Sequence, residues 1–117
     1  MNMRNGRSRK EVKMTDRNKI MELVQEELHE ANNVHPLFHS LHEAWAVIWE
    51  EFEETKADKD RCETYLKRAW NGCKEDDSEE FLAEVDSAKH AAIGVAQEAI
   101  QVAAMCQKAL ESNIDAE

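Results

Sequence analysis

Four glutamates crowd a short stretch near the middle of the chain, at Glu50, Glu51, Glu53 and Glu54. On a helix, side chains three positions apart project from the same face, so Glu51 and Glu54, or Glu50 and Glu53, could hold one object together. Hard divalent cations such as Mg²⁺ take oxygen ligands of this kind. The alternative interpretation is a solvated acidic face, which is what a run of charges on a helix usually forms.

A second polar pair lies late in the chain, where Glu98 and Gln101 stand three positions apart in an alanine-rich apolar segment. If the two segments form neighbouring helices, Glu51, Glu54, Glu98 and Gln101 could converge on one cavity. Converging carboxylates raise each other's pKa and are costly unless a cation neutralises them. The pattern therefore indicates a magnesium site, on the condition that Glu98 faces the first pair.

Histidines and tryptophans near the first acidic stretch suggest two further chemistries. His35, His39 and His42 follow helical spacing and would offer ligands to zinc, although local hydrogen bonds near a helix start are the simpler interpretation. A base could stack on Trp45 or Trp49, but aromatic residues four apart on a helix are usually core. The sequence contains no nucleophile elbow and no glycine-rich phosphate loop, so any phosphate chemistry must depend on a metal held by carboxylates.

The composition predicts an all-α fold. Of 117 residues, 42% are apolar, yet the chain has only three glycines and one proline, too few for the frequent reversals of a β-sheet. We expect one small domain, an antiparallel bundle of three to five helices with long central helices. Because a few long helices each bury only one stripe, we also expect a homodimer or homotetramer to complete the core.

The net charge of −10 argues against nucleic acid as the main partner. Residues 1–19 nevertheless carry +5, which leaves −15 for the rest of the chain. We predict a basic, mobile arm at residues 1–14 and a single helical domain at 15–117. Thr15 or Asp16 would cap the first helix.

The three cysteines lack the spacing of a zinc site and are odd in number, which favours a reducing cytoplasm over disulfides. No apolar run approaches the length of a membrane span, and the N-terminus lacks the apolar segment of a signal peptide. These features predict a cytoplasmic protein that has no membrane partner.

The second helix is expected to begin at Pro36, which suits a first helical turn, and to stop at Asn71-Gly72. The polar tract from Thr55 to Arg61 contains no breaker, so the helix either continues through it or restarts with a cap at Asp60. The last helix would open with Asp77 as its cap and Glu80 three positions later. The second helix carries a continuous apolar stripe, formed by Leu37, Leu41, Trp45, Ile48 and Phe52.

The segments HPLFHSLHEAWAVIWEEFEET and AQEAIQVAAMCQKAL together resemble phage- and prophage-associated relatives of the MazG-like all-α nucleotide pyrophosphohydrolases. That superfamily carries EExxE on one helix and ExxD on a later helix. The resemblance implies that Glu51 and Glu54, supported by Glu50, match the first motif, and that Glu98 matches the start of the second. Gln101 stands where the family has aspartate.

The resemblance implies a magnesium-dependent hydrolase that splits nucleoside triphosphates into monophosphate and pyrophosphate. Glu51, Glu54 and Glu98 would hold Mg²⁺, while Glu50 and Gln101 would serve catalysis, with Gln101 orienting a water or a phosphate oxygen. An amide binds magnesium less strongly than a carboxylate, so activity could be reduced or lost. The alternative function is a non-catalytic helical oligomer of phage or prophage origin that serves protein interaction, since a fold alone does not carry an activity.

Overall fold

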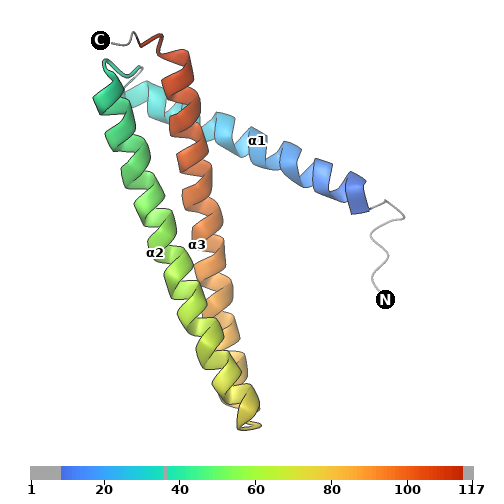
Figure 1. Cartoon of the computed structure of the whole chain (residues 1–117). Coiled ribbons are helices and arrows are strands. Elements are labelled where there is room, and N and C mark those ends of the chain that lie inside the picture. The colour runs from blue at the N-terminus through green and yellow to red at the C-terminus, as the bar shows by residue number, and fades with distance from the viewer. Residues whose placement is uncertain (1–8, 36, 115–117) are drawn as a thin grey trace.

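The computed structural model of the chain describes residues 9–35 and 37–114, with side chains from residue 16 onward. It contains three helices, α1 (Arg9–Val34), α2 (Leu41–Lys74) and α3 (Ser78–Glu111), and no strand within these residues. The predicted all-α fold is confirmed. Figure 1 shows α2 and α3 running antiparallel beside each other, while α1 leaves one end of this pair at a steep angle. The first helix, α1, packs against α3 rather than against α2.

The first helix begins earlier than its predicted cap. Because α1 starts at Arg9, the prediction of a start at Thr15 or Asp16 is wrong. The segment RKEVKM is made largely of good helix formers, with neither glycine nor proline, so nothing local stops the helix there. The first eight residues of the predicted arm lie outside the described part of the chain.

The second helix begins later than predicted, at Leu41 rather than at Pro36, a residue outside the described part. Ser40 is the N-cap: its Oγ accepts a hydrogen bond from the Glu43 amide at 3.0 Å. The Glu43 carboxylate in turn accepts from the His39 amide at 2.6 Å. This reciprocal pair satisfies amides that the first turn leaves free, and it fixes the helix start there.

The turn between α2 and α3 is tight. The helix α2 continues unbroken through the polar tract that could have interrupted it, and ends at Lys74, just past the predicted stop. The predicted cap of α3 is confirmed, because Asp77 Oδ1 accepts from the Glu80 amide at 3.1 Å. A Cβ on Gly72 would lie only 2.9 Å from the Phe81 amide nitrogen, so the turn needs a glycine where the two helices meet.

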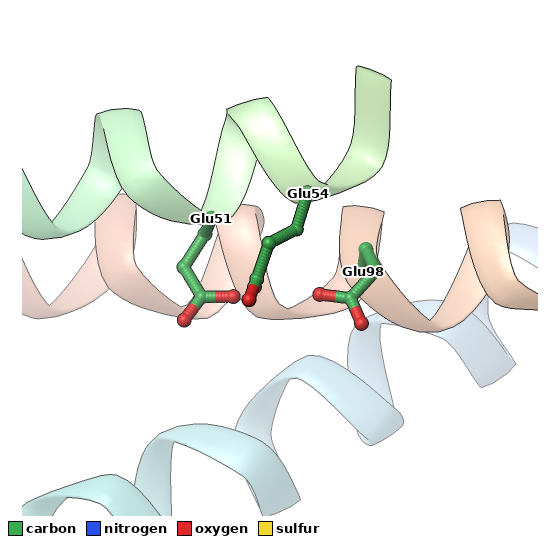
Figure 2. Close-up of side chains that lie close together, drawn as sticks. All are labelled: Glu51, Glu54 and Glu98. Atoms are coloured by element: carbon green, nitrogen blue, oxygen red, sulfur yellow. The ribbon is translucent and has the colours of Figure 1, made fainter. Parts of the chain in front are cut away.

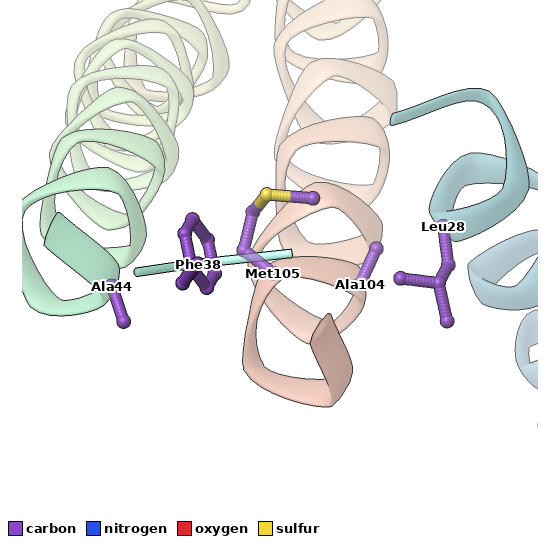
Figure 3. Close-up of a cluster of buried hydrophobic side chains, with 5 residues drawn as sticks. All are labelled: Leu28, Phe38, Ala44, Ala104 and Met105. Carbon is purple, nitrogen blue, oxygen red and sulfur yellow. The ribbon is translucent and has the colours of Figure 1, made fainter. Parts of the chain in front are cut away.

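The main buried cluster sits at the other end of the pair, where α1 joins it. It consists of five side chains drawn in Figure 3: Leu28, Phe38, Ala44, Ala104 and Met105. The connection before α2 is fixed to the end of α3, since the Phe38 amide donates to Ser112 Oγ at 3.0 Å. The Lys108 ammonium lies 4.8 Å from the centre of the Phe38 ring. These contacts hold the three helices together at one end.

Along the rest of the pair, the buried residues of α2 and α3 are small, at Ala69, Gly72 and Ala88. Small residues let two helices approach closely, and they leave the large apolar side chains outside. No helix in the described part of the chain combines the length and the apolar character that a membrane span requires.

Candidate functional site

Three carboxylates converge between α2 and α3. Glu51 and Glu54 project from successive turns of α2, and Glu98 projects from α3 toward them (Figure 2). One oxygen from each residue lies within 4.8 Å of the others. Among the described residues, this is the only such group of three histidine, cysteine or acidic side chains. The condition set by the sequence, that Glu98 faces the first pair, is met.

The donor set suits a hard cation. Oxygens around an octahedral Mg²⁺ lie at about 2.1 Å from it, which places neighbouring oxygens about 3.0 Å and opposite oxygens about 4.2 Å apart. The three glutamate oxygens are already grouped within 4.8 Å. All three side chains offer carboxylate oxygens, the type of ligand that hard cations prefer.

Burial and mutual repulsion make the cluster unfavourable when all its carboxylates are ionised. Burial raises the pKa of Glu51 to about 7, and the charge of Glu54, a hydrogen bond with Glu54, and the charges of Glu98 and Glu50 add to this effect. The pKa of Glu98 is raised as well, first by burial and then by the charge of Glu54 and a hydrogen bond with it. A bound cation would relieve this repulsion, and a shared proton relieves it in the absence of one.

Gln101 lies within the same cluster. When its amide nitrogen faces the carboxylates, it donates to Glu51 Oε2 at 2.7 Å and to Glu98 Oε2 at 3.3 Å. This orientation satisfies the amide, whereas the reverse would place its oxygen against other oxygens. Where the resembled family has a fourth carboxylate, this chain therefore has a neutral donor that joins the two helices.

Glu50 is not part of the group of three. It is exposed on α2, and its charge contributes only the smallest of the effects that raise the pKa of Glu51. The predicted catalytic role of Glu50 thus requires its carboxylate to act from the rim of the cluster.

The sequence analysis missed three charged residues beside the cluster. The charges of Asp58 on α2 and Glu27 on α1 both help to raise the pKa of Glu98. Arg61 forms an ion pair with Asp58. The signal for Asp58 and Arg61 was present, because they lie four and seven positions after Glu54 and so share its helical face. Glu27 had no such signal, since only the fold brings α1 to this side.

An open polar groove lies along the helix pair and begins one helical turn from the cluster, at Asp58 after Glu54 and at Gly94 before Glu98. Its volume is about 460 Å³, and it is lined by eight residues of α2 and α3: Asp58, Arg61, Tyr65, Asp86, Ser87, His90, Ala91 and Gly94. A Cβ on Gly94 would lie 3.0 Å from Asp58 Oδ2, so the glycine makes room for this carboxylate. The acidic cluster therefore borders a groove that contains an arginine.

Three lysines are candidate partners for a triphosphate, namely Lys56, Lys89 and Lys108, and none of them suits the position of the cluster. Lys108 is buried under Phe38. Lys56 follows Glu54 by two positions and thus lies about 200° from it around α2. Lys89 precedes Glu98 by nine positions, about half a turn away around α3, and it pairs with Asp86 at 3.6 Å. Arg61 is the basic residue on the same face as the glutamates.

A zinc site at the histidines gains no support, and the interpretation of the two tryptophans as core residues is wrong. His35, His39 and His42 do not form a group that could bind a metal within the described residues. Trp45 and Trp49 are exposed rather than core, at 62% and 43% of their full surface, and they stack on each other with ring centres 5.3 Å apart.

The chain was compared with models of protein families, with curated proteins and with solved structures, and none of the three comparisons gives a match. The relationship to MazG-like hydrolases therefore stays a prediction that rests on the two motifs.

Proposed function

We propose that the chain is a relative of the MazG-like pyrophosphohydrolases, and that it hydrolyses (d)NTP to (d)NMP and pyrophosphate in the presence of Mg²⁺. The convergence of Glu51, Glu54 and Glu98 from two helices supports this proposal most directly. Burial and repulsion raise the pKa of Glu51 and Glu98, so negative charge is concentrated at one point between the helices, where a bound cation would offset it.

Each residue of the cluster would have a distinct part. Glu51, Glu54 and Glu98 would hold the cation, which when bound would offset the charge of the triphosphate. Gln101, whose amide already reaches two of these carboxylates, would orient a water or a phosphate oxygen. Glu50, at the rim, would accept a proton from the attacking water as the bond between the first and second phosphates breaks.

Arg61 is the candidate to contact the far phosphates. It lies seven positions after Glu54, about 10.5 Å along the helix, and it lines the polar groove together with Asp58. In the chain alone its partner is Asp58, and the Arg61 side chain in this salt bridge is 59% exposed, so it remains accessible to a ligand. A phosphate would offer Arg61 a stronger, two-pronged partner.

The test is release of pyrophosphate from a panel of dNTPs with Mg²⁺. The native protein should release it, whereas Glu51→Gln and Glu54→Gln, which keep the size of the side chain but remove its charge, should not. Glu53→Gln is the matched control, because Glu53 lies on the same helix but outside the cluster. Equal release from all four proteins, or none from the native protein, would contradict the hydrolase proposal.

The second candidate function is that of a non-catalytic helical protein that acts by association. Two observations favour it: the neutral Gln101 in the cluster, and the exposed aromatic residues on the outside of α2. Under this proposal, the native protein releases no pyrophosphate, but still associates through the exposed side chains.

A further inference from the structure

The outward side of α2 carries a regular stripe of exposed residues. Its members recur at alternating spacings of four and three, as in a coiled-coil seam, through Trp45, Trp49, Phe52, Lys56, Lys59, Glu63, Leu66 and Trp70. The five apolar members are between 43% and 62% exposed. A seam of this kind is the side of a helix that normally meets another helix, and within the described chain α3 and α1 leave it uncovered.

The first part of the stripe is a ridge of stacked rings. Trp45 stacks on Trp49 at 5.3 Å between ring centres with the planes 12° apart, and Trp49 contacts Phe52 at the same separation. The rings support one another and so form a rigid apolar projection.

The last part of the stripe borders a groove. An open apolar space of about 700 Å³ lies between α2 and α3, with Cys62, Leu66 and Trp70 on one wall and Ala92 and Val95 on the other. Charged residues form its rim, at Lys59, Glu63 and Lys67. The same helix thus presents a ridge near its start and a groove of matching apolar character near its end.

We propose that this stripe binds a second copy of the chain, with the two α2 helices antiparallel about a two-fold axis near residue 61. In this register, Phe52 of each copy lies opposite the partner's Trp70, at the end of the partner's groove, and Trp49 lies opposite the partner's Cys73, just beyond it. A ridge and a groove on one face can satisfy each other twice only in a two-fold dimer, because such an interface uses the same patch on both subunits.

Two charged residues in the middle of the stripe, Lys59 and Glu63, agree with the same register, while Lys56 lies opposite the partner's Leu66, which its aliphatic stem can cover. Phe52 and Trp70 are symmetric about residue 61, and so are Lys59 and Glu63. Lys59 therefore lies opposite the partner's Glu63, and Glu63 lies opposite the partner's Lys59. A parallel pairing would instead place Lys59 beside the partner's Lys59.

The exposed area agrees with a dimer of ordinary size. A large aromatic side chain has 150–250 Å² to bury, so the four aromatic residues, which are about half exposed, offer roughly 400 Å² per copy, and Leu66 adds to this area. This area matches the largest apolar patches on monomers, which are often functional, and it is about half of the roughly 800 Å² that each partner buries in a standard interface. The charged residues between the two ends supply the remainder.

The dimer would leave the carboxylate cluster open. Glu54 follows Phe52 by two positions and lies about 200° from it around α2, on the far side from the stripe. The inference therefore does not depend on the hydrolase proposal.

The first test is the oligomeric state of the full chain by sedimentation over a range of concentrations. We expect a dimer whose Kd rises by at least about 30-fold in Trp49→Ala and in Trp70→Ala, as for residues central to an interface. Helix content by circular dichroism should be unchanged, since both side chains are exposed. A native chain that stays monomeric at about 100 µM, or a dimer that is indifferent to both variants, overturns the proposal.

The second test fixes the register by charge reversal. Lys59→Glu and Glu63→Lys each place like charges opposite each other twice, so each alone should weaken its dimer by about tenfold or more. Mixed together, the two variants should form a heterodimer close to native affinity, because every charge then faces its opposite. Lys89→Glu, an exposed lysine on α3, is the control and should dimerise like the native chain. No recovery on mixing overturns the antiparallel register.

Discussion

On one side of α2, Glu51, Glu54 and Asp58 turn toward α3 and crowd their charges together, while on the opposite side Trp49, Phe52 and Trp70 point away from the chain. Both sides use the same helical spacing. They differ in the contacts that their side chains make within the chain. The carboxylates contact one another and Gln101, whereas the aromatic rings contact only neighbours along the same helix. In the two proposals, the first side holds a small ligand and the second side binds a large partner.

The largest effects should come from variants that change the function of one side of α2 and leave the other side intact. Glu54→Gln should lower Mg²⁺ affinity by at least about 100-fold, since even residues that only support a metal ligand cost 10–100-fold when changed. The same variant should dimerise normally, and Trp70→Ala should show the converse. Calorimetric titration and sedimentation measure the two properties separately. If either variant changed both properties equally, the two sides would not be independent.

The next largest effect should be a difference in stability between alanine variants of two glycines. Gly72→Ala should destabilise the fold by about 1–3 kcal/mol, because its Cβ meets backbone atoms of Phe81 that cannot move aside. Gly94→Ala meets only the flexible end of Asp58, so the better helix propensity of alanine should raise stability by up to about 1 kcal/mol. Urea denaturation measures both. Equal losses in the two variants would show that the groove at Gly94 is as tightly packed as the turn.

Gln101→Asp should change metal binding in the opposite direction from Glu54→Gln. A fourth carboxylate in place of the amide should raise Mg²⁺ affinity by about tenfold, because it adds a charged ligand. Without the cation, the same variant should be less stable than the native chain, since the hydrogen bonds to Glu51 and Glu98 become repulsions. Thermal melts with and without Mg²⁺ test both statements, and a variant that is more stable without the cation would contradict the second.

The smallest effect should be a dependence of stability on pH. Since the pKa of Glu51 rises from 4.5 to about 7 on folding, the folded chain keeps a proton that the unfolded chain releases between these values. The free energy of unfolding measured without metal should therefore fall as pH rises through this window. Glu51→Gln should flatten the change. Urea denaturation at about pH 5 and about pH 8 tests it, and a rise in native stability over this range would contradict the raised pKa.

The sequence predicted those features that depend on spacing along one helix. The all-α fold, the cap at Asp77 and the shared face of Glu51 and Glu54 all follow from local rules. Helix ends were less predictable, because Ser40 competes with Pro36 as a start signal and only the hydrogen bond to Glu43 decides between them. The position of Glu27 beside the cluster depends on how α1 meets α3, which no local pattern encodes.

The tryptophans show a different limit. Their spacing correctly indicates an apolar helix face of the kind that is usually buried, and the sequence analysis assigned them to a core on that basis. Small residues such as Ala69 and Ala88 instead fill the contact between α2 and α3, and the large rings remain outside. Periodicity identifies an apolar face, but it does not tell whether the same chain covers it.

The most direct test of the central claim is a count of Mn²⁺ or Mg²⁺ bound by the native protein and by Glu98→Gln. Glu98 is the informative residue because it comes from α3, while the other two ligands share α2. Calorimetric titration should show one saturable site per chain in the native protein, no such site in Glu98→Gln, and an unchanged site in Glu53→Gln. A native protein that binds no cation, or a Glu98→Gln variant that binds it equally well, would contradict the assignment of this cluster as a metal site.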